Sequence, residues 1–292
     1  MNCTELDVLL SPAEFEGLPE QDLSDTSCVV FDVLRATSTM TVALANGAEA
    51  ILPCATIGEA IATRESEPGL LLAGERGGQR ITAEISGGTE FDLGNSPREM
   101  TRDVVAEKRM AATTTNGTRA LKACSGSKAV WIGSFLNLTA LGQAIRDANP
   151  KRLLLVCAGT GEASALEDAL GAGALSDLLW PALGQAATDS ARLVRDHYRS
   201  NQAQLLAVAS EAKNARHLSS IPALAPDVEF CLQQDTHPVV GKMSEDGWVN
   251  VEALHAETTA AAERARAAAA AEAEAEAAAA AARAKAQAEA EA

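Results

Sequence analysis

Short apolar runs alternate with amphipathic stretches along most of the chain. This pattern predicts strands alternating with helices in a largely parallel or mixed sheet. The apolar run 28–34 is followed by a helical stretch, 37–46, and Thr56 with Glu59 has the spacing of a capping box for another helix. Further strands are expected at 49–54, 70–74, 110–114, 129–133, 152–158 and 228–232, and further helices at 118–124, 138–148, 166–179 and 189–211. We therefore expect an α/β fold.

The composition changes sharply near residue 256. Residues 1–255 carry the alternating pattern, whereas residues 256–292 are mostly Ala with Glu, Arg and Lys. Alanine is the strongest helix former, but this segment has no stripe of large apolar residues with which to pack. We expect one folded α/β domain over 1–255 and an Ala/Glu-rich helical or disordered tail over 256–292.

Composition and charge narrow the class of partner. Apolar residues make up 47% of the chain but aromatic residues only 3%, so the core has to be built from Ala, Val, Leu and Ile. The net charge of −16 argues against nucleic acid or an anionic membrane as the main partner. The sequence has neither a basic-then-apolar leader nor a long uncharged apolar run. We expect a cytoplasmic protein that binds a small anionic molecule, with a homo-oligomer left open.

Three polar segments follow predicted strands, where ligands of open α/β sheets bind. They read DVLRATST (32–39), FDLGNSP (91–97) and TTTNGT (113–118). Each combines carboxylate, hydroxyl or amide groups with a glycine or a helix start. Such groups suit a cleft that holds a metal ion beside an anionic group.

The first segment places Asp32 at a strand end and Arg35, Thr37 and Ser38 at the next helix start. Asp32 is expected to bind Mg²⁺, and the other three are expected to contact phosphate. An ordinary strand-to-helix turn with a polar cap would explain the same residues. A phosphatase with an aspartyl nucleophile normally has a second Asp two residues later, where this chain has Leu34. That weakens the covalent alternative without removing it.

Two further acidic positions complete the expected metal site. Glu75 is a predicted metal ligand or general base, and Arg76 a predicted anion contact, although a buried ion pair is the structural alternative. Asp92 is the third predicted metal ligand, with Asn95 and Ser96 as substrate contacts. An Asx turn closed by the following proline would account for the same letters.

The TTTNGT segment supplies the expected phosphate or water contacts. Asn116 is assigned a catalytic role here, although an Asn-Gly pair also forms simple turns. Glu167 and Asp168 open a later helix, and there a metal role and a helix-dipole role remain alternatives. The remaining predicted substrate contacts are Thr114, Thr115, Gly117 and Thr118, with Ser134 and Asn137 after the next strand.

The blocks DVLRATST, LLAGERGG, FDLGNSP, TTTNGTRAL, GSFLN and DVEFCLQQD resemble the 2-phosphosulfolactate phosphatase family over about residues 29–240. The resemblance implies a three-layer α/β/α fold. It also implies Mg²⁺-dependent hydrolysis of 2-phospho-3-sulfolactate to 3-sulfolactate and phosphate, a step of sulfonate metabolism and notably of coenzyme M biosynthesis. In this hypothesis the catalytic residues are Asp32, Arg35, Glu75, Arg76 and Asn116, and the metal ligands are Asp32, Glu75 and Asp92.

Two positions depart from the family pattern. The spacer between Arg76 and Phe91 is longer than usual, and Ala165 stands between Ser164 and Leu166, where the family tends to place serine directly before LED. Both departures leave the main polar blocks intact but bear on substrate preference. Two rival hypotheses remain: a phosphatase for another small phosphorylated 2-hydroxy acid, and a non-catalytic binder of an anionic metabolite.

The tail lies outside the resemblance, which gives a first prediction. Deleting residues 256–292 should leave turnover of a phosphate ester unchanged, because none of the three polar segments lies there. Steady-state kinetics of the truncated and full-length chains check this. A large loss of turnover in the truncated chain would show that the tail contributes to the active protein.

Overall fold

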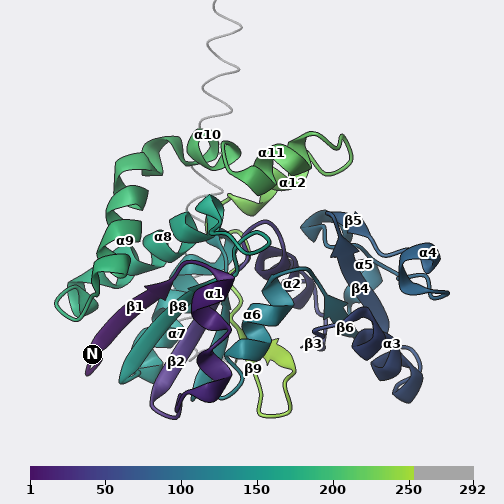
Figure 1. Cartoon of the computed structure of the whole chain (residues 1–292), viewed down its shortest axis with the longest axis horizontal. Helices are drawn as coiled ribbons and strands as arrows, with labels where there is room; N and C mark the ends of the chain where they lie inside the picture. Colours follow the sequence, from purple (N-terminus) through teal and green to yellow (C-terminus); the bar gives the residue numbers. More distant parts are fainter. Residues whose placement is uncertain (253–292) are drawn as a thin grey trace, which may run out of the picture. The chain divides into compact units, whose positions relative to one another are not determined.

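The computed structural model describes residues 1–252, so the expected tail over 256–292 lies outside the described residues. The described part is organised around a ten-stranded mixed sheet (Figure 1). The strands are β1 Glu5–Leu9, β2 Thr26–Phe31, β3 Ala50–Pro53, β4 Leu71–Arg76, β5 Gln79–Arg80, β6 Arg109–Thr113, β7 Ala129–Gly133, β8 Arg152–Cys157, β9 Gly241–Met243 and β10 Val249–Val251. The expected α/β class is confirmed.

The sheet consists of two parallel blocks joined by an antiparallel hairpin. Its strand order is β1-β8-β2-β7-β9-β10-β3-β6-β4-β5. Pairing is parallel within β1-β8-β2-β7 and within β3-β6-β4. The hairpin of β9 and β10 pairs antiparallel with β7 on one side and β3 on the other. The sheet is therefore mixed, as one of the two expected arrangements, and its parallel strands belong to two blocks.

The central strands β2 and β8 of the first block are almost fully buried, whereas the edge strand β1 (ELDVL) alternates and was not expected from the sequence. Every residue of β2 (TSCVVF) is buried, as are five of the six residues of β8 (RLLLVC). Strands covered on both faces read this way because neither set of side chains meets water. This is why the sequence pattern located these strands with boundaries close to those in the structure.

Helices pack in two groups against the sheet. Helices α7 and α8 contact each other and strands of the first block, whereas α6 contacts α1, α2, β2 and β3, and α2 contacts β7 and β9. The three-layer arrangement stays a prediction. The helices are α1 Pro12–Phe15, α2 Ala36–Ala45, α3 Ile57–Ser66, α4 Ala83–Ser86, α5 Arg102–Val105, α6 Gly117–Ala123, α7 Leu138–Ala148, α8 Leu166–Leu183, α9 Asp189–Asn201, α10 Leu205–Ser210, α11 Lys213–Ser219 and α12 Pro226–Cys231, with short 3₁₀ turns at Leu18–Glu20, Pro97–Glu99, Phe135–Asn137 and Gln202–Gln204.

The strand expected at 228–232 is wrong, because the structure has helix α12 there. Pro226 stands at the first helical position, where its missing N–H costs nothing. Val228, Cys231 and Leu232 are buried. Their spacing of three and four residues is that of one helix face. The short apolar run was interpreted as a strand, but its buried residues follow the periodicity of a helix.

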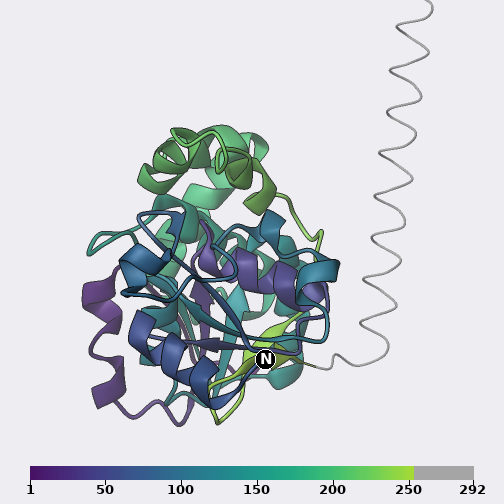
Figure 2. The same cartoon turned by 90° about the vertical axis from the view of Figure 1, so that its right-hand side faces the viewer.

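The helix expected over 189–211 is divided into α9 and α10 by a 3₁₀ turn. The side-chain amide of Asn201 donates to the carbonyl of His197, which occupies a carbonyl at the end of α9. The chain then continues into α11, an element that the sequence analysis did not expect. In Figures 1 and 2, α10–α12 lie above the strands, and in Figure 1 α9 runs along one side. Helix α11 forms one wall of the site described below.

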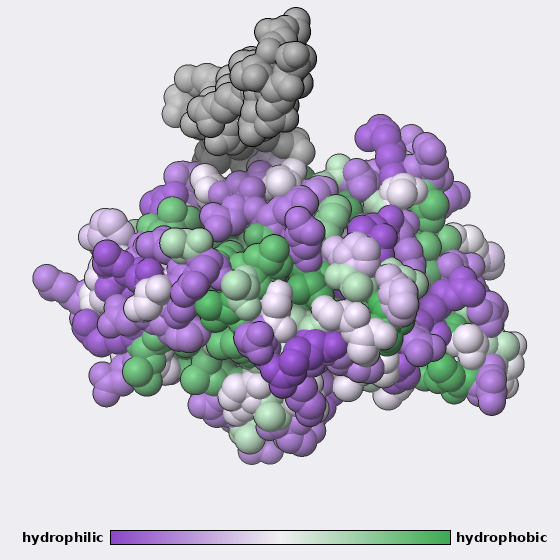
Figure 3. Space-filling view, turned by 90° about the horizontal axis from the view of Figure 1, so that it is seen from above, coloured by the Kyte–Doolittle hydropathy of each residue, from purple (hydrophilic) through white to green (hydrophobic). Residues whose placement is uncertain are grey.

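Two absences hold for residues 1–252. The cysteines there form no disulfide, and all except Cys3 are buried. No described helix is long and apolar enough to cross a membrane. On the face shown in Figure 3, hydrophilic residues predominate and hydrophobic ones lie between them.

Helices α8 and α9 approach each other closely at Gly173, which gives a prediction for the fold. A Cβ atom at this position would lie 2.2 Å from the carbonyl oxygen of Val194. Because backbone cannot move aside as a side-chain tip can, Gly173→Ala should lower the free energy of unfolding by about 1–3 kcal/mol. Denaturant unfolding measures this change.

Gly58 in α3 provides the matched control. The nearest atom to a Cβ there would be Thr56 Oγ1 at 3.9 Å. Gly58→Ala should therefore raise stability by about 0.5–1 kcal/mol through helix propensity alone. Equal effects of the two substitutions would contradict the close packing of α8 on α9.

Candidate active site

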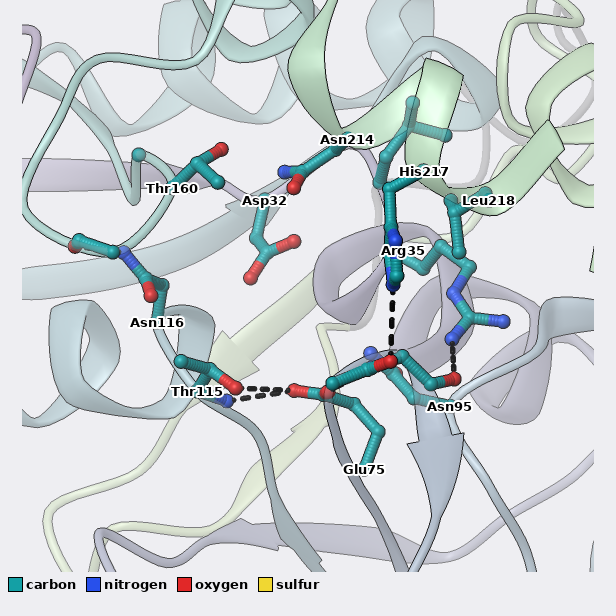
Figure 4. Close-up of a pocket in the computed structure, with 15 residues that line it drawn as sticks. Asp32, Arg35, Glu75, Asn95, Thr115, Asn116, Thr160, Asn214, His217 and Leu218 are labelled. Atoms are coloured by element: carbon teal, nitrogen blue, oxygen red, sulfur yellow. Dashed lines mark hydrogen bonds between the residues drawn. The ribbon is translucent and has the colours of Figure 1, made fainter. Parts of the chain in front are cut away.

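A cavity of about 240 Å³ lies where loops from both parallel blocks meet (Figure 4). The first block contributes the loops after β2 and β8, and the second contributes the end of β4 and the loop after β6. Helix α11 closes the cavity from another side. The lining residues are Asp32, Leu34, Arg35, Glu75, Gly77, Gly78, Asn95, Thr115, Asn116, Gly159, Thr160, Gly161, Asn214, His217 and Leu218.

Asp32 is buried at the end of β2 and faces the centre of the cavity in Figure 4. Its Oδ1 accepts a hydrogen bond from the Ala36 amide at 3.1 Å, whereas its Oδ2 has no hydrogen bond within the described residues. Burial raises the pKa of Asp32 to about 7, and the negative charges of Glu75 and Glu167 add to the rise. The carboxylate is thus held in place on one side and open toward the cavity on the other.

Gly117 permits this position of Asp32. A Cβ atom on residue 117 would lie 2.4 Å from Asp32 Oδ2 and 2.6 Å from the Ala36 Cβ. Helix α6 can therefore begin beside Asp32 only because residue 117 lacks a side chain. The structure gives Gly117 a steric reason, where the sequence analysis had predicted a substrate contact.

Glu75 lies opposite, with both carboxylate oxygens engaged. Its Oε1 accepts hydrogen bonds from the backbone N–H and the hydroxyl of Thr115, each at 2.8 Å, and its Oε2 accepts one from the Gly78 amide at 2.8 Å. These donors come from the loop after β6 and from the turn between β4 and β5. They fix the orientation of the carboxylate and leave its remaining lone pairs available.

Arg35 is buried in the cavity wall and paired with a residue far along the chain. Its Nη1 donates to Asp227 Oδ2 at 2.6 Å, and its Nη2 donates to the carbonyl of Gly78. His217 also bonds this turn, through a contact of 3.0 Å between its Nε2 and the Gly77 carbonyl oxygen. The glycine turn is therefore held from two sides at the edge of the cavity.

Asn116 connects two loops. Its side-chain amide donates to the carbonyls of Ala158 and Gly161, at 2.8 and 2.9 Å. Both N–H groups are used in this way, so the oxygen of the side chain is the atom left for a ligand. Asp168 also joins two loops: its carboxylate accepts hydrogen bonds from the Val33 amide after β2 and from the Gly159 amide after β8.

The structure does not bring Asp92 to the cavity. Its Oδ2 accepts hydrogen bonds from Arg64 at 2.9 Å and from the Leu72 amide at 2.8 Å, and its side chain is 40% exposed. Asp92 precedes Leu93, which bridges Ala73 in the second block. That pairing turns the carboxylate toward α3, away from Asp32 and Glu75.

Several other predicted residues support the site without lining the cavity. Arg76 donates to Thr113 Oγ1 and to the Glu75 carbonyl. Thr37 and Ser38 close the turn after β2 through hydrogen bonds to the carbonyls of Asp32 and Val33. The same holds for Ser96, which bonds Asp227, for Thr114 and Thr118, which bond each other, and for Ser134 and Asn137, which cap the turn before α7.

Sequence reasoning missed the face of α11 that lines the cavity. Asn214, His217 and Leu218 lie at spacings of three and four, which is the signal of one helix face. Asn214 Nδ2 donates to Glu167 Oε1 at 2.8 Å, which ties α11 to α8. Asp227 was also missed, although it stands in a block that carried the family resemblance.

The donor groups of the cavity suit a Mg²⁺ ion that is held by few protein ligands. Among residues 1–252, no three acidic, His or Cys side chains form a ready-made metal cage. Mg²⁺ commonly binds one or two carboxylates and completes its shell with waters and substrate phosphate. Asp32 and Glu75 provide two carboxylates, and the free Oδ2 of Asp32 faces the cavity.

Glu167 adds to the acidic surroundings. It is 1% exposed, and its Oε2 is one of the few buried side-chain atoms of the described chain without a hydrogen-bond partner. Burial raises the pKa of Glu167. Burial also raises the pKa of Asp168, and the negative charges of Glu167 and Asp32 raise it further. A bound cation would relieve this concentration of buried carboxylates.

Comparison with known proteins identifies the family of the chain. The family model for 2-phosphosulpholactate phosphatase matches residues 13–246. A protein of Caldicellulosiruptor saccharolyticus named "Probable 2-phosphosulfolactate phosphatase" is 34% identical over 232 residues, covering 78% of this chain and 93% of the relative.

Two further relatives carry the same name. The protein of Pseudothermotoga lettingae is 37% identical over 80% of this chain and 96% of its own length. That of Thermotoga petrophila is 37% identical over 73% of this chain and 87% of its own length. With the family model matching most of the chain, the protein belongs to the 2-phosphosulfolactate phosphatase family of phosphoric monoester hydrolases.

Proposed function

We propose that this chain hydrolyses 2-phospho-3-sulfolactate to 3-sulfolactate and inorganic phosphate, with Mg²⁺ held by Asp32 and Glu75. The observation that carries the proposal is the cavity in which these two carboxylates meet Arg35, Thr115 and Asn116. The family of the chain supplies the substrate class. A place in sulfonate metabolism, including coenzyme M biosynthesis, would follow from that substrate.

The charges of the cavity support a cation. The substrate carries phosphate, carboxylate and sulfonate groups, whereas the cavity presents the carboxylates of Asp32 and Glu75. Arg35 is its only arginine among the described lining residues, and this arginine is paired with Asp227. An anion would be repelled by such a site unless a divalent ion offsets the carboxylates.

In this proposal the reaction is a single displacement at phosphorus by water. The oxygen of water forms a new P–O bond, the ester P–O bond breaks, and the leaving oxygen takes a proton to become the 2-hydroxyl of sulfolactate. When bound, Mg²⁺ supplies charge neutralisation at the phosphate oxygens. Asn116, whose N–H groups are both used, offers its side-chain oxygen to accept a hydrogen bond from the attacking water.

Thr115 and Glu75 act together in this proposal. The hydroxyl and amide of Thr115 hold Glu75 Oε1, and the Gly78 amide holds Oε2. A carboxylate fixed by three donors keeps its direction without reorganising during the reaction. The predicted phosphate contact of Thr115 is thereby replaced by the role of orienting Glu75.

One observation favours a second candidate substrate. Arg76, the expected second arginine anchor, bonds to Thr113 and does not line the cavity. A phosphorylated 2-hydroxy acid without sulfonate would need fewer positive contacts. Comparing kcat/KM for 2-phospho-3-sulfolactate and 2-phospholactate decides between them, and a preference for 2-phospholactate would favour this alternative.

Substitution of Asp32 tests the metal site. Asp32→Asn keeps the size of the side chain but removes a charged ligand, so Mg²⁺-dependent release of phosphate should fall by about 1000-fold or more. Asp92→Asn is the matched control and should retain turnover within about twofold, because Asp92 lies outside the cavity. Normal turnover in the Asp32 variant, or its loss in the Asp92 variant, would contradict the assignment.

The raised pKa of Asp32 predicts a pH-dependent stability. Burial raises the pKa to about 7 from 3.8, so the stabilising contribution of this group is complete below pH 3.8 and is lost as the pH rises through 7. In metal-free protein, Asp32→Asn should therefore stabilise the fold relative to the native chain, by of the order of 2 kcal/mol more at pH 8 than at pH 5.

Thermal unfolding at the two pH values, with and without Mg²⁺, measures this effect. At pH 8, Mg²⁺ should raise the Tm of the native chain much more than that of Asp32→Asn, because only the native chain has both carboxylate ligands. An equal Mg²⁺ response in both proteins would place the ion elsewhere.

A further inference from the structure

The partner of Arg35 is a carboxylate that lies behind the cavity wall. Asp227 is 0% exposed and accepts hydrogen bonds from three side chains. Arg35 Nη1 reaches Oδ2 at 2.6 Å, while Ser96 Oγ and Arg98 Nε reach Oδ1 at 2.8 and 2.7 Å. One carboxylate at the start of α12 thus joins the loop after β2 to the FDLGNSP segment.

The charges of this group do not cancel. Arg35 and Asp227 alone would form a neutral pair and give the cavity little attraction for an anion. Arg98 contacts the same carboxylate from the other side, so two positive charges share one negative charge, and a net charge of +1 remains. Arg98 therefore offsets Asp227 and leaves the charge of Arg35 effective toward the cavity.

Arg98 itself does not line the cavity. It is 38% exposed, and its Nη2 donates to the carbonyl of Ala223. Arg35, in contrast, is a lining residue, and its Nη2 is fixed by the Gly78 carbonyl. The two arginines thus have different tasks, one facing the ligand and one compensating the carboxylate behind it.

The position of Arg35 indicates which group it would meet. In Figure 4, Arg35 and His217 lie on one side of the cavity, and Thr115 and Asn116 lie on the other, with Asp32 between them. If phosphate lies over Asp32 and Glu75, the carboxylate stays close because it is on the ester carbon. The sulfonate is one carbon farther away, so it can reach a wall of the cavity beyond the carboxylate, and Arg35 is the one arginine among the described lining residues.

We propose that the Arg35 side of the cavity is the sulfonate subsite and that Arg98, through Asp227, is a positioning residue that sets its charge. The proposal rests on the proposed function, since it presumes a substrate with an acidic group besides phosphate. It assigns a specificity role to a residue that touches no substrate.

Arg98→Met tests the proposal, because removing Asp227 itself would leave buried charges unpaired and destabilise the fold. The KM for 2-phospho-3-sulfolactate should rise about tenfold, with kcat within about twofold. The KM for 2-phospholactate, which lacks the sulfonate, should change by less than about twofold. Arg98→Lys should recover most of the affinity, because it restores the positive charge.

Arg102→Met is the matched control. Arg102 is exposed on the nearby helix α5, and the substitution removes the same charge without touching Asp227. Its KM for both esters should equal that of the native chain. An equal rise of KM in Arg98→Met and Arg102→Met would show that only the overall charge of the protein matters. An equal rise of KM for both esters in Arg98→Met would contradict the sulfonate assignment.

Binding measurements separate this inference from the proposed function. In titration calorimetry with Mg²⁺ present, Arg98→Met should bind 3-sulfolactate about tenfold more weakly and inorganic phosphate with unchanged affinity. If Arg98→Met weakens sulfolactate binding as expected but the native chain releases no phosphate from the ester, the proposed function is contradicted and the subsite is supported. Turnover with unaltered sulfolactate binding in Arg98→Met would contradict the subsite alone.

Discussion

The site depends on the burial of Asp32 beside other carboxylates. Water cannot screen these charges, and the pKa of Asp32 rises to about 7 as a result. A cavity built this way repels the anion that its family acts upon. In our proposal two features relieve this repulsion: a cation bound by Asp32 and Glu75, and a positive charge at Arg35 that survives its pairing with Asp227.

The fold brings these groups together from distant parts of the chain. Two parallel blocks supply Asp32 and Glu75 at their strand ends, and the β9–β10 hairpin joins the blocks into one sheet. The C-terminal helices then add Asn214, His217 and Asp227. Short loops held by their own hydrogen bonds fix each group, so most of the polar residues around the cavity serve geometry and few are left for a ligand.

Much of this could be read from the sequence, and the remainder has a physical reason for its absence. Buried strands give unambiguous apolar runs, so Asp32, Glu75 and the threonine segment were correctly placed at strand ends. Strand patterns do not specify the direction of a side chain beyond the strand. The contact of Asp92 with Arg64 could therefore not be predicted from the sequence. Asp227 was missed because a short helix was read with the period of a strand, and its partners lie more than a hundred residues away.

The most direct test of the central claim is a crystal structure of the protein soaked with Mg²⁺ and 3-sulfolactate. The account predicts electron density for the ion in contact with Asp32 and Glu75, and for the sulfonate within hydrogen-bond distance of Arg35. An ion bound away from both carboxylates, or a sulfolactate molecule outside this cavity, would contradict it.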